Sequence, residues 1–250
     1  MDILETHAYD RRQRQNMSCA LFLSLVPFFL ASAAFLFLWA HDSPPPSVIA
    51  AGVKAAPVLL LAAMVLGWNG WKSLGGVAGG LLLSAVGDCC LVWPELFIHG
   101  MGAFAAAHLL FSLAFLTARY LPRRPSSSHS VLLYLLVFGL GAAFYVYIYP
   151  FLQKAPDSAL LTPGVGVYVG LITLMANLAI RTGQVAAILG SVSFLVSDSV
   201  LALQVFKVIA SIKHGHAAVM VTYYLAQMLI AVGDVLVVED QDDFSKWKRS

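Results

Sequence analysis

One carboxylate interrupts the apolar run Leu81-Leu82-Leu83-Ser84-Ala85-Val86-Gly87-Asp88-Cys89-Cys90-Leu91-Val92-Trp93, which is long enough to form a helix in a membrane. A run of the same design, Gly190-Ser191-Val192-Ser193-Phe194-Leu195-Val196-Ser197-Asp198-Ser199-Val200-Leu201, follows about 110 residues later. An ionised carboxylate at the centre of a bilayer costs about 2.5 to 3.5 kcal/mol on insertion scales, so such residues normally face the protein interior and serve a function there. Asp88 and Asp198 therefore predict a site inside a helical bundle.

The composition of the whole chain supports a membrane location. Of the 250 residues, 60% are hydrophobic and 11% are charged, and the mean hydropathy is +0.81. Soluble domains carry about 25% charged residues, so we expect an integral membrane protein. The net charge of +2 and the lack of a basic stripe interleaved with aromatic residues argue against a nucleic-acid partner. Cys19, Cys89 and Cys90 all lie in apolar runs, and we expect no disulfide among them.

Eight apolar windows have about the 20 residues that a membrane-spanning helix needs. They lie near residues 19–40, 48–67, 75–93, 99–117, 130–149, 163–181, 185–206 and 217–238. The connections between them are short and contain proline, glycine or polar residues, as turns do. We therefore predict an all-α, eight-helix membrane domain over residues 19–238, with an N-terminal segment at 1–18 and a C-terminal tail at 239–250.

The basic residues predict the orientation, because cytosolic loops carry an excess of lysine and arginine. With a cytosolic N-terminus, eleven basic residues fall on the cytosolic side: Arg11, Arg12, Arg14, Lys72, Arg119, Arg123, Arg124, Arg181, Lys246, Lys248 and Arg249. The far side holds three, Lys154, Lys207 and Lys213. Both termini are therefore predicted to be cytosolic. The last five residues have the dilysine arrangement of endoplasmic-reticulum retrieval signals, although tails this short also arise by chance.

The two runs that contain the aspartates indicate an internal duplication. Val86-Gly87-Asp88-Cys89-Cys90-Leu91 resembles Val196-Ser197-Asp198-Ser199-Val200-Leu201, and each falls in the third helix of a predicted four-helix half. Halves with an even number of helices enter the membrane in the same direction, as in parallel repeats. Both aspartates are then expected at one depth, about two-thirds of the way along a helix that runs away from the cytosol.

The residues around the aspartates allow them to act together. Gly79 and Gly80 precede Asp88, and Gly190 precedes Asp198, and small residues of this kind let membrane helices approach closely. Two neighbouring buried carboxylates cannot both ionise cheaply, so their proton affinities differ, and one can serve as an acid while the other serves as a base. The alternative is that each aspartate only satisfies a local hydrogen-bond donor and locks helices together.

Five other polar residues in the spans are candidates for the site. Lys54 could bind a phosphate, hold an aspartate ionised or extend to the membrane interface. His108 is either a hydrogen-bonded packing residue or a site residue. One interpretation is that a cavity is lined by Tyr223, Tyr224 and Gln227. The alternative for the two tyrosines is an interfacial aromatic belt. A buried glutamine needs hydrogen-bond partners.

Other features of the sequence predict no function. Asp234 begins an acidic run with Glu239, Asp240, Asp242 and Asp243, which we expect to be solvated tail. His214 and His216 have no nearby cysteine or carboxylate to complete a metal site. There is neither a glycine-rich phosphate loop nor a Gly-x-Ser-x-Gly motif. We expect no metal and no cofactor.

Several motifs together resemble the YhhN-like lysoplasmalogenase family, and the resemblance runs from about Pro27 to Val237. The matching segments are Ser84 to Glu95, Ala106-Ala107-His108-Leu109-Leu110, Phe194-Leu195-Val196-Ser197-Asp198 and Thr222-Tyr223-Tyr224-Leu225-Ala226-Gln227-Met228-Leu229. The resemblance implies an eight-helix enzyme, resident in the endoplasmic reticulum in animals, that hydrolyses the vinyl ether of lysoplasmalogens to a fatty aldehyde and a glycerophospho-alcohol.

The resemblance also implies roles for the candidate residues. The catalytic pair of the family corresponds to Asp88 and Asp198. A vinyl ether cleaves after protonation of carbon, which leaves an oxocarbenium ion, so a protonated carboxyl and an ionised partner suit the reaction as they suit two-carboxylate glycosidases. We expect the substrate to contact the remaining candidates, with Lys54 at its phosphate and His108, Tyr223, Tyr224 or Gln227 orienting water or the ether oxygen.

Other classes of function fit parts of the sequence. Paired intramembrane acids also suit a proton-coupled lipid or small-molecule transporter, although no span is unusually short or broken at matching positions of both halves. An intramembrane aspartyl protease would have Gly-x-Gly-Asp and Tyr-Asp, where this chain has Ala85-Val86-Gly87-Asp88 and Ser197-Asp198. A receptor or structural role leaves two costly carboxylates without a reason.

Overall fold

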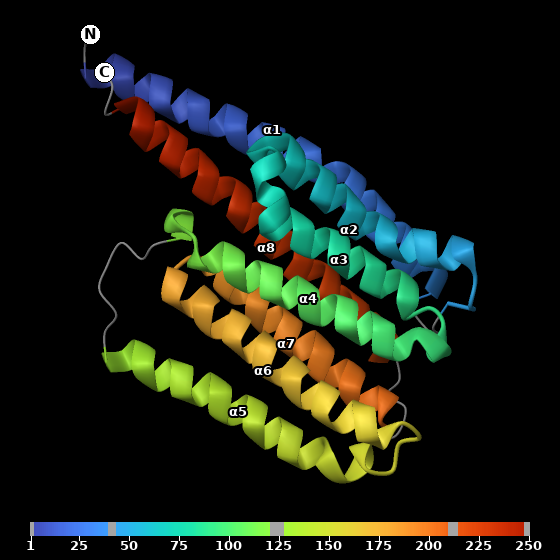
Figure 1. Ribbon diagram of the computed structural model, residues 1–250. Coiled ribbons are helices and arrows are strands. Elements are labelled where there is room, and N and C mark those ends of the chain that lie inside the picture. Colours follow the sequence, from blue (N-terminus) through green and yellow to red (C-terminus); the bar gives the residue numbers. More distant parts are fainter. Residues whose placement is uncertain (1–2, 40–43, 121–127, 210–214, 248–250) are drawn as a thin grey trace.

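The computed structural model describes residues 3–39, 44–120, 128–209 and 215–247, and near the ends of α1, α5 and α8 it describes only the backbone. Within these ranges the chain forms eight α-helices that run side by side in one bundle (Figure 1). They are α1 (Ile3–Trp39), α2 (Val48–Asn69), α3 (Val77–Cys90), α4 (Phe97–Leu116), α5 (Ser128–Leu152), α6 (Ser158–Thr182), α7 (Val185–Val205) and α8 (Gly215–Trp247). Three short 3₁₀ helices connect them: η1 (Trp71–Gly75), η2 (Pro94–Leu96) and η3 (Ala118–Tyr120).

Seven of the described helices are long and apolar enough to cross a membrane, and α3 is the exception with 14 residues. The prediction of an all-α, multi-pass membrane protein is confirmed in this form. An eighth span and an internal repeat stay predictions. The segment at 121–127, Lys213, His214 and the last three residues of the dilysine tail lie outside the described residues.

α3 is shorter than its apolar run because turns shorten both ends. The segment before it forms η1, followed by Gly76, and Pro94 begins η2 a few residues after α3 ends. Asp88 consequently lies in the last turn of α3 rather than two-thirds along it. Asp198 does lie where it was predicted, because it is the fourteenth of the 21 residues of α7 counted from Val185. Glu95 lies in η2 and is exposed.

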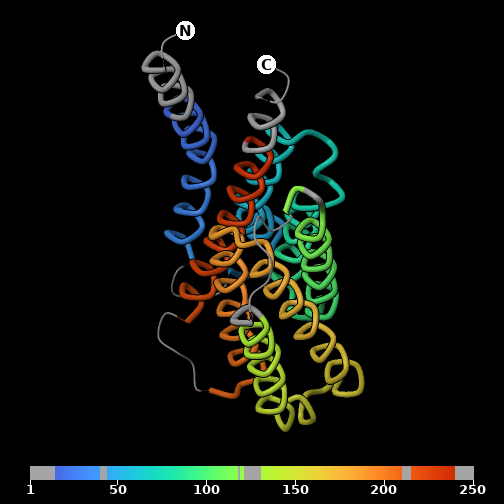
Figure 2. Tube along the Cα trace, turned by 90° about the vertical axis from the view of Figure 1, so that its left-hand side faces the viewer, coloured from blue at the N-terminus to red at the C-terminus, as the bar shows by residue number. Residues whose placement is uncertain are grey.

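The central helices carry the site and the outer ones cover it. In Figure 1, α1 and α5 lie at opposite edges of the bundle, where α1 packs mainly on α2 and α5 mainly on α6. The two most extensive contacts, α7 with α8 and α3 with α4, lie between these edges. α1 begins and α8 ends at the same end of the bundle, as Figures 1 and 2 show from two directions.

Glycines allow the close approach of the central helices, as expected. A methyl group at Gly80 would lie 2.4 Å from the Phe111 ring of α4, and one at Gly87 would lie 2.6 Å from the Phe104 ring. These two contacts fix the antiparallel register of α3 against α4. Gly190 of α7 packs in the same way against Ala226 and Ile230 of α8.

Asp234 is buried in α8, so the prediction of a solvated tail is wrong for this residue. Its side chain accepts hydrogen bonds from the Tyr120 hydroxyl at 2.8 Å and from the Asn69 amide at 2.7 Å. Burial and the neighbouring Asp234 raise the pKa of Tyr120, which lies beyond the end of α4, well above its usual value. The Tyr120 hydroxyl therefore stays protonated and ties η3 to α8.

Candidate active site

Asp88 lies in a buried network formed by α2, α3 and α8. The Tyr223 hydroxyl donates a hydrogen bond to Asp88 Oδ2 at 2.6 Å, and Lys54 Nζ lies 3.9 Å from Asp88 Oδ1. Asp88 is 1% exposed and Lys54 is 7% exposed. Buried polar groups require partners, and here the Asp88 carboxyl faces the Lys54 amine and the Tyr223 hydroxyl.

Tyr224 and Gln227 lie beside this network on α8. The Tyr224 hydroxyl donates to the Lys54 carbonyl at 2.8 Å, which holds the turn of α2 that carries the lysine. Gln227 is fully buried one turn from Tyr223. Among the described residues, however, neither polar atom of the Gln227 amide has a partner at ordinary hydrogen-bond distance.

Asp198 lies in a second network, formed by α4, α6 and α7. The Tyr168 hydroxyl donates to Asp198 Oδ2 at 2.5 Å, and His108 Nε2 lies 3.0 Å from the same hydroxyl and 3.4 Å from Asp198 Oδ2. His108 is fully buried, whereas the Asp198 side chain is 17% exposed. His108 is therefore hydrogen-bonded, as the packing interpretation expected, but its partner is the tyrosine that binds the aspartate.

The two networks are neighbours without direct contact between the carboxylates. The Phe194 ring lies 5.0 Å from the His108 ring and 5.7 Å from the Tyr223 ring, centroid to centroid, so it packs against both networks. Each aspartate nevertheless takes its tyrosine hydrogen bond from a different helix, so any proton that passes between them needs intermediate groups.

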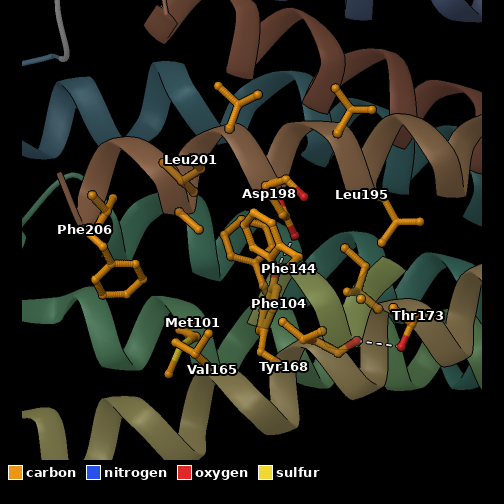
Figure 3. Close-up of a pocket in the computed structure, with 18 of the residues that line it drawn as sticks. Met101, Phe104, Phe144, Val165, Tyr168, Thr173, Leu195, Asp198, Leu201 and Phe206 are labelled. Atoms are coloured by element: carbon orange, nitrogen blue, oxygen red, sulfur yellow. Dashed lines mark hydrogen bonds between the residues drawn. The ribbon is translucent and has the colours of Figure 1, made fainter. Parts of the chain in front are cut away.

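A cavity of about 520 Å³ lies between α4, α5, α6 and α7, and Asp198 is on its wall (Figure 3). In Figure 3, Asp198 points towards Tyr168, with Phe104 and Phe144 beside them. Most of the remaining lining is aliphatic or aromatic, from Phe206 at one end of α7 to Val192 nearer the other. Sites of 300 to 1,000 Å³ with apolar walls and a few polar groups are typical for small molecules.

The cavity opens towards lipid between α5 and α7. Leu140, Val192 and Val196 line it and are also 62%, 45% and 47% exposed, so they form a rim on the outer surface of the bundle. α5 packs closely only against α6, where a methyl group at Gly141 would lie 2.5 Å from Thr173. Asp198 therefore shares its cavity with apolar residues of the outer surface of the bundle.

The described cavity lining includes Asp198 but none of the other residues predicted for the site. Asp88, Lys54, Tyr223 and Gln227 lie on the far side of Phe104, which both lines the cavity and packs against Tyr223 at 5.7 Å between ring centroids. His108 and Tyr224 are also absent from the lining. These residues lie buried within the protein core.

Tyr168 is the site residue that sequence reasoning missed. It lines the cavity and joins Asp198 to His108. The available signal was its place in the middle of an apolar span, because tyrosines of the aromatic belt lie at the ends.

The two aspartates have different electrostatic environments. Asp88 faces an ammonium group, whereas Asp198 faces a neutral tyrosine, a histidine and an apolar cavity. The Asp198 carboxyl is therefore the one presented to the cavity, and the Asp88–Lys54 pair lies in the core behind it. No group of three or more potential metal ligands occurs in the part of the chain that the structure describes.

The chain resembles a known family and several curated proteins. The YhhN family model matches residues 49–234. The chain is 38% identical over 210 residues to lysoplasmalogenase TMEM86B of Sus scrofa, with 83% of this chain and 84% of that protein covered. It is 35% identical over 237 residues to lysoplasmalogenase TMEM86A of Bos taurus, with 88% and 92% covered.

Similarity extends to bacteria. A lysoplasmalogenase of Mycobacterium tuberculosis (strain CDC 1551 / Oshkosh) is 30% identical over 220 residues, which cover 82% of this chain and 79% of that protein. No solved structure matches the chain.

Proposed function

This chain belongs to the YhhN family, and on that premise we propose that it hydrolyses the vinyl ether bond of lysoplasmalogens inside the membrane by means of Asp88 and Asp198. It is an enzyme of the hydrolase class, as its curated relatives are. The proposed products are a fatty aldehyde and glycerophosphoethanolamine or glycerophosphocholine. The observation that carries the proposal is the placement of Asp198, with its tyrosine, on an apolar cavity that opens to lipid.

The dimensions of the cavity suit a single-chain lipid. Asp198 of α7 and Phe206, the residue that follows α7, both line it and are eight residues apart, which is about 12 Å along a helix. A glycerophosphate head group near Phe206 would therefore bring the vinyl ether to Asp198. The alkenyl chain would continue towards Val192 and Thr173, where the rim between α5 and α7 leads to the membrane.

Asp198 is assigned as the general acid because protonation of a carbon needs direct contact. The neutral carboxyl of Asp198 delivers its proton to the vinyl carbon beyond the one that bears oxygen, and an oxocarbenium ion forms. Water attacks this ion, and the resulting hemiacetal collapses to aldehyde and alcohol. Positioned acids and bases contribute about 10²- to 10⁴-fold to such reactions.

Asp88 is assigned as the ionised partner. In this assignment Asp88 reacts in its charged form, opposite Lys54 at 3.9 Å, and its negative charge near the cavity stabilises the oxocarbenium ion, as the second carboxylate of a glycosidase does. Asp88 also receives the proton that the attacking water loses. Because Asp88 does not line the cavity, this proton arrives through hydrogen-bonded groups, of which Tyr223 is the nearest.

The test of the function is aldehyde release from a purified lysoplasmalogen by the purified protein in detergent. We expect one aldehyde per vinyl ether consumed, and no release from the corresponding alkyl-ether lysophospholipid, which has no double bond to protonate. A transporter needs a sealed membrane to act, so catalysis in detergent separates the two classes. Failure to release aldehyde from any lysoplasmalogen would refute the proposal.

Tyr168→Phe is expected to lower kcat by about 10- to 100-fold, because the variant loses the hydrogen bond that orients the carboxyl of Asp198 while it keeps the ring that lines the cavity. KM should change little. Initial rates over a range of substrate concentrations give both constants. Tyr145→Phe is the matched control, since it removes a part-buried hydroxyl that donates to the Thr162 carbonyl and not to Asp198. Equal effects of the two variants on kcat would contradict a specific role for Tyr168.

We propose further that α3 crosses the membrane as an eighth helix and that the two halves form a parallel repeat. The common end at which α1 begins and α8 ends supports an even number of crossings. The excess of basic residues at that end supports cytosolic termini. With the dilysine tail, these features support residence in the endoplasmic-reticulum membrane, which imaging of the full chain with a lumenal or cytosolic tag would test.

A further inference from the structure

Four buried side chains in the centre of the bundle carry polar atoms without a hydrogen-bond partner among the described residues. The atoms are Ser84 Oγ, Ser191 Oγ, His108 Nδ1 and both polar atoms of the Gln227 amide. Each of the four residues is at most 1% exposed. Buried polar groups are almost always hydrogen-bonded to protein or to ordered water, so these atoms require an explanation.

The helix register places the four residues in one layer. The Asp88–Tyr223 hydrogen bond aligns α3 with α8, which run in opposite directions. One turn before Asp88 on α3 and one turn after Tyr223 on α8, Ser84 is therefore level with Gln227. On α7, Gly190 packs against Ala226 and Ile230, on either side of Gln227, so Ser191 lies at the same level. We name these residues, with His108, the polar layer.

His108 joins the polar layer from α4. Gly80 and Gly87 of α3 contact Phe111 and Phe104 of α4 respectively, so Ser84, which lies between the glycines, is level with His108, which lies between the phenylalanines. The layer therefore receives one side chain from each of the four central helices.

The polar layer lies between the two carboxylate networks. Gln227 and Ser84 are each one turn from the Asp88–Tyr223 pair, whereas His108 belongs to the network of Asp198. Phe194 of α7 lies between the two networks, because its ring contacts both His108 and Tyr223. Ser191 is one helical turn from Phe194 on α7.

The hydrogen-bond directions leave His108 with a free acceptor. Tyr168 has one hydroxyl hydrogen, which it donates to Asp198, so His108 Nε2 must carry the hydrogen that binds the Tyr168 oxygen. His108 Nδ1 then bears a lone pair. The two serine hydroxyls and the Gln227 amide can both donate and accept, and a buried water needs about two to four such partners.

We propose that the polar layer binds water and that this water returns a proton from Asp88 to Asp198 after each turnover. The inference rests on the proposed function, in which Asp198 loses a proton to the vinyl carbon and Asp88 gains one from the attacking water. Hydrolysis then leaves Asp88 protonated and Asp198 ionised. The return transfer restores both groups, so the full cycle consumes one water and no net proton.

The proton path uses the hydrogen bonds of the two carboxylate networks and the proposed water between them. It runs from Asp88 through Tyr223 to the water held by Ser84, Ser191 and Gln227, then through His108 and Tyr168 to Asp198. Each group passes on one proton as it receives another. Without the water, no hydrogen bond joins Tyr223 to His108 Nδ1, and the path is interrupted there.

The test is rapid-quench measurement of aldehyde release by the full chain mixed with excess lysoplasmalogen. In the double variant Ser84→Ala and Ser191→Ala, enzymes that start with Asp198 protonated should release about one aldehyde each at the wild-type rate. Later turnovers should be at least tenfold slower, because the return of the proton is now limiting. Wild-type protein should show no such burst.

Ser112→Ala is the matched control, because the Ser112 hydroxyl is buried on the same helix as His108 but bonds the His108 carbonyl. It should behave as wild type, and each single variant of the polar layer should turn over at an intermediate rate. Melting temperatures check that all variants fold.

Two results would overturn the proposal: steady-state turnover of the double variant at the wild-type rate, or slowing of the first and later turnovers by the same factor. The second result would mean that the serines only support the structure. A third result, no aldehyde release by the wild-type protein, would overturn the proposed function as well as the relay. This result can be told apart from the other two, because in both of those the wild-type protein is active.

Discussion

Replacement of Asp198 by asparagine is expected to lower aldehyde release by about 10²- to 10⁴-fold, the range for loss of a positioned general acid. Asparagine keeps the shape of the side chain and can still accept the hydrogen bond from Tyr168, but it has no acidic proton to give to carbon. The substrate cavity is unchanged in size, so KM should stay within a few-fold of wild type. Steady-state assays in detergent measure both constants.

Asp234→Asn is the matched control for this variant. Asp234 is also a buried aspartate with a tyrosine donor, but it lies in the bundle where Tyr120 and Asn69 bind it, away from the cavity lining. Its replacement should leave kcat within a few-fold of wild type. If Asp198→Asn retained wild-type turnover, proton delivery by Asp198 would be refuted.

Replacement of Asp88 by asparagine is expected to lower both activity and stability. The variant loses the ionised carboxylate that stabilises the oxocarbenium ion, and it leaves the Lys54 ammonium buried without a partner. Removal of one member of a buried ion pair typically costs about 3 to 5 kcal/mol in unfolding free energy. A lower melting temperature and a loss of turnover comparable to that of Asp198→Asn are therefore expected.

A second substitution separates these two effects. In the double variant Lys54→Met and Asp88→Asn, the uncompensated charge is gone, so most of the lost melting temperature should return. Activity should not return, because the carboxylate is still missing. Recovery of activity together with stability would show that Asp88 serves only to balance Lys54, and would remove it from the reaction.

The fold could be predicted from sequence because the length of an apolar run determines a membrane helix. Helices α2, α4 and α7 begin and end within a few residues of the expected windows. The length of α3 was overestimated, because the apolar run continues into the turns beside Gly76 and Pro94, where 3₁₀ helices adjoin α3. Hydropathy measures the apolar content of a segment and not its backbone conformation.

The candidate site could be predicted in part. The cost of a carboxylate in hydrocarbon singled out Asp88 and Asp198, and each has a buried network of its own. The mid-span position of Tyr168 did not by itself single it out, because tyrosine is tolerated in apolar spans and its contact with Asp198 depends on how α6 packs against α7. Asp234 was wrongly placed because its partners, Asn69 and Tyr120, are distant in sequence.

The double variant Asp88→Asn with Asp198→Asn tests most directly whether the two acids work as one catalytic unit. Residues that act in a single step show strongly non-additive losses. We therefore predict that the double variant releases aldehyde no more slowly than the less active single variant, within a few-fold. A loss equal to the product of the two single losses would mean that the carboxyls contribute independently, and would contradict the paired mechanism.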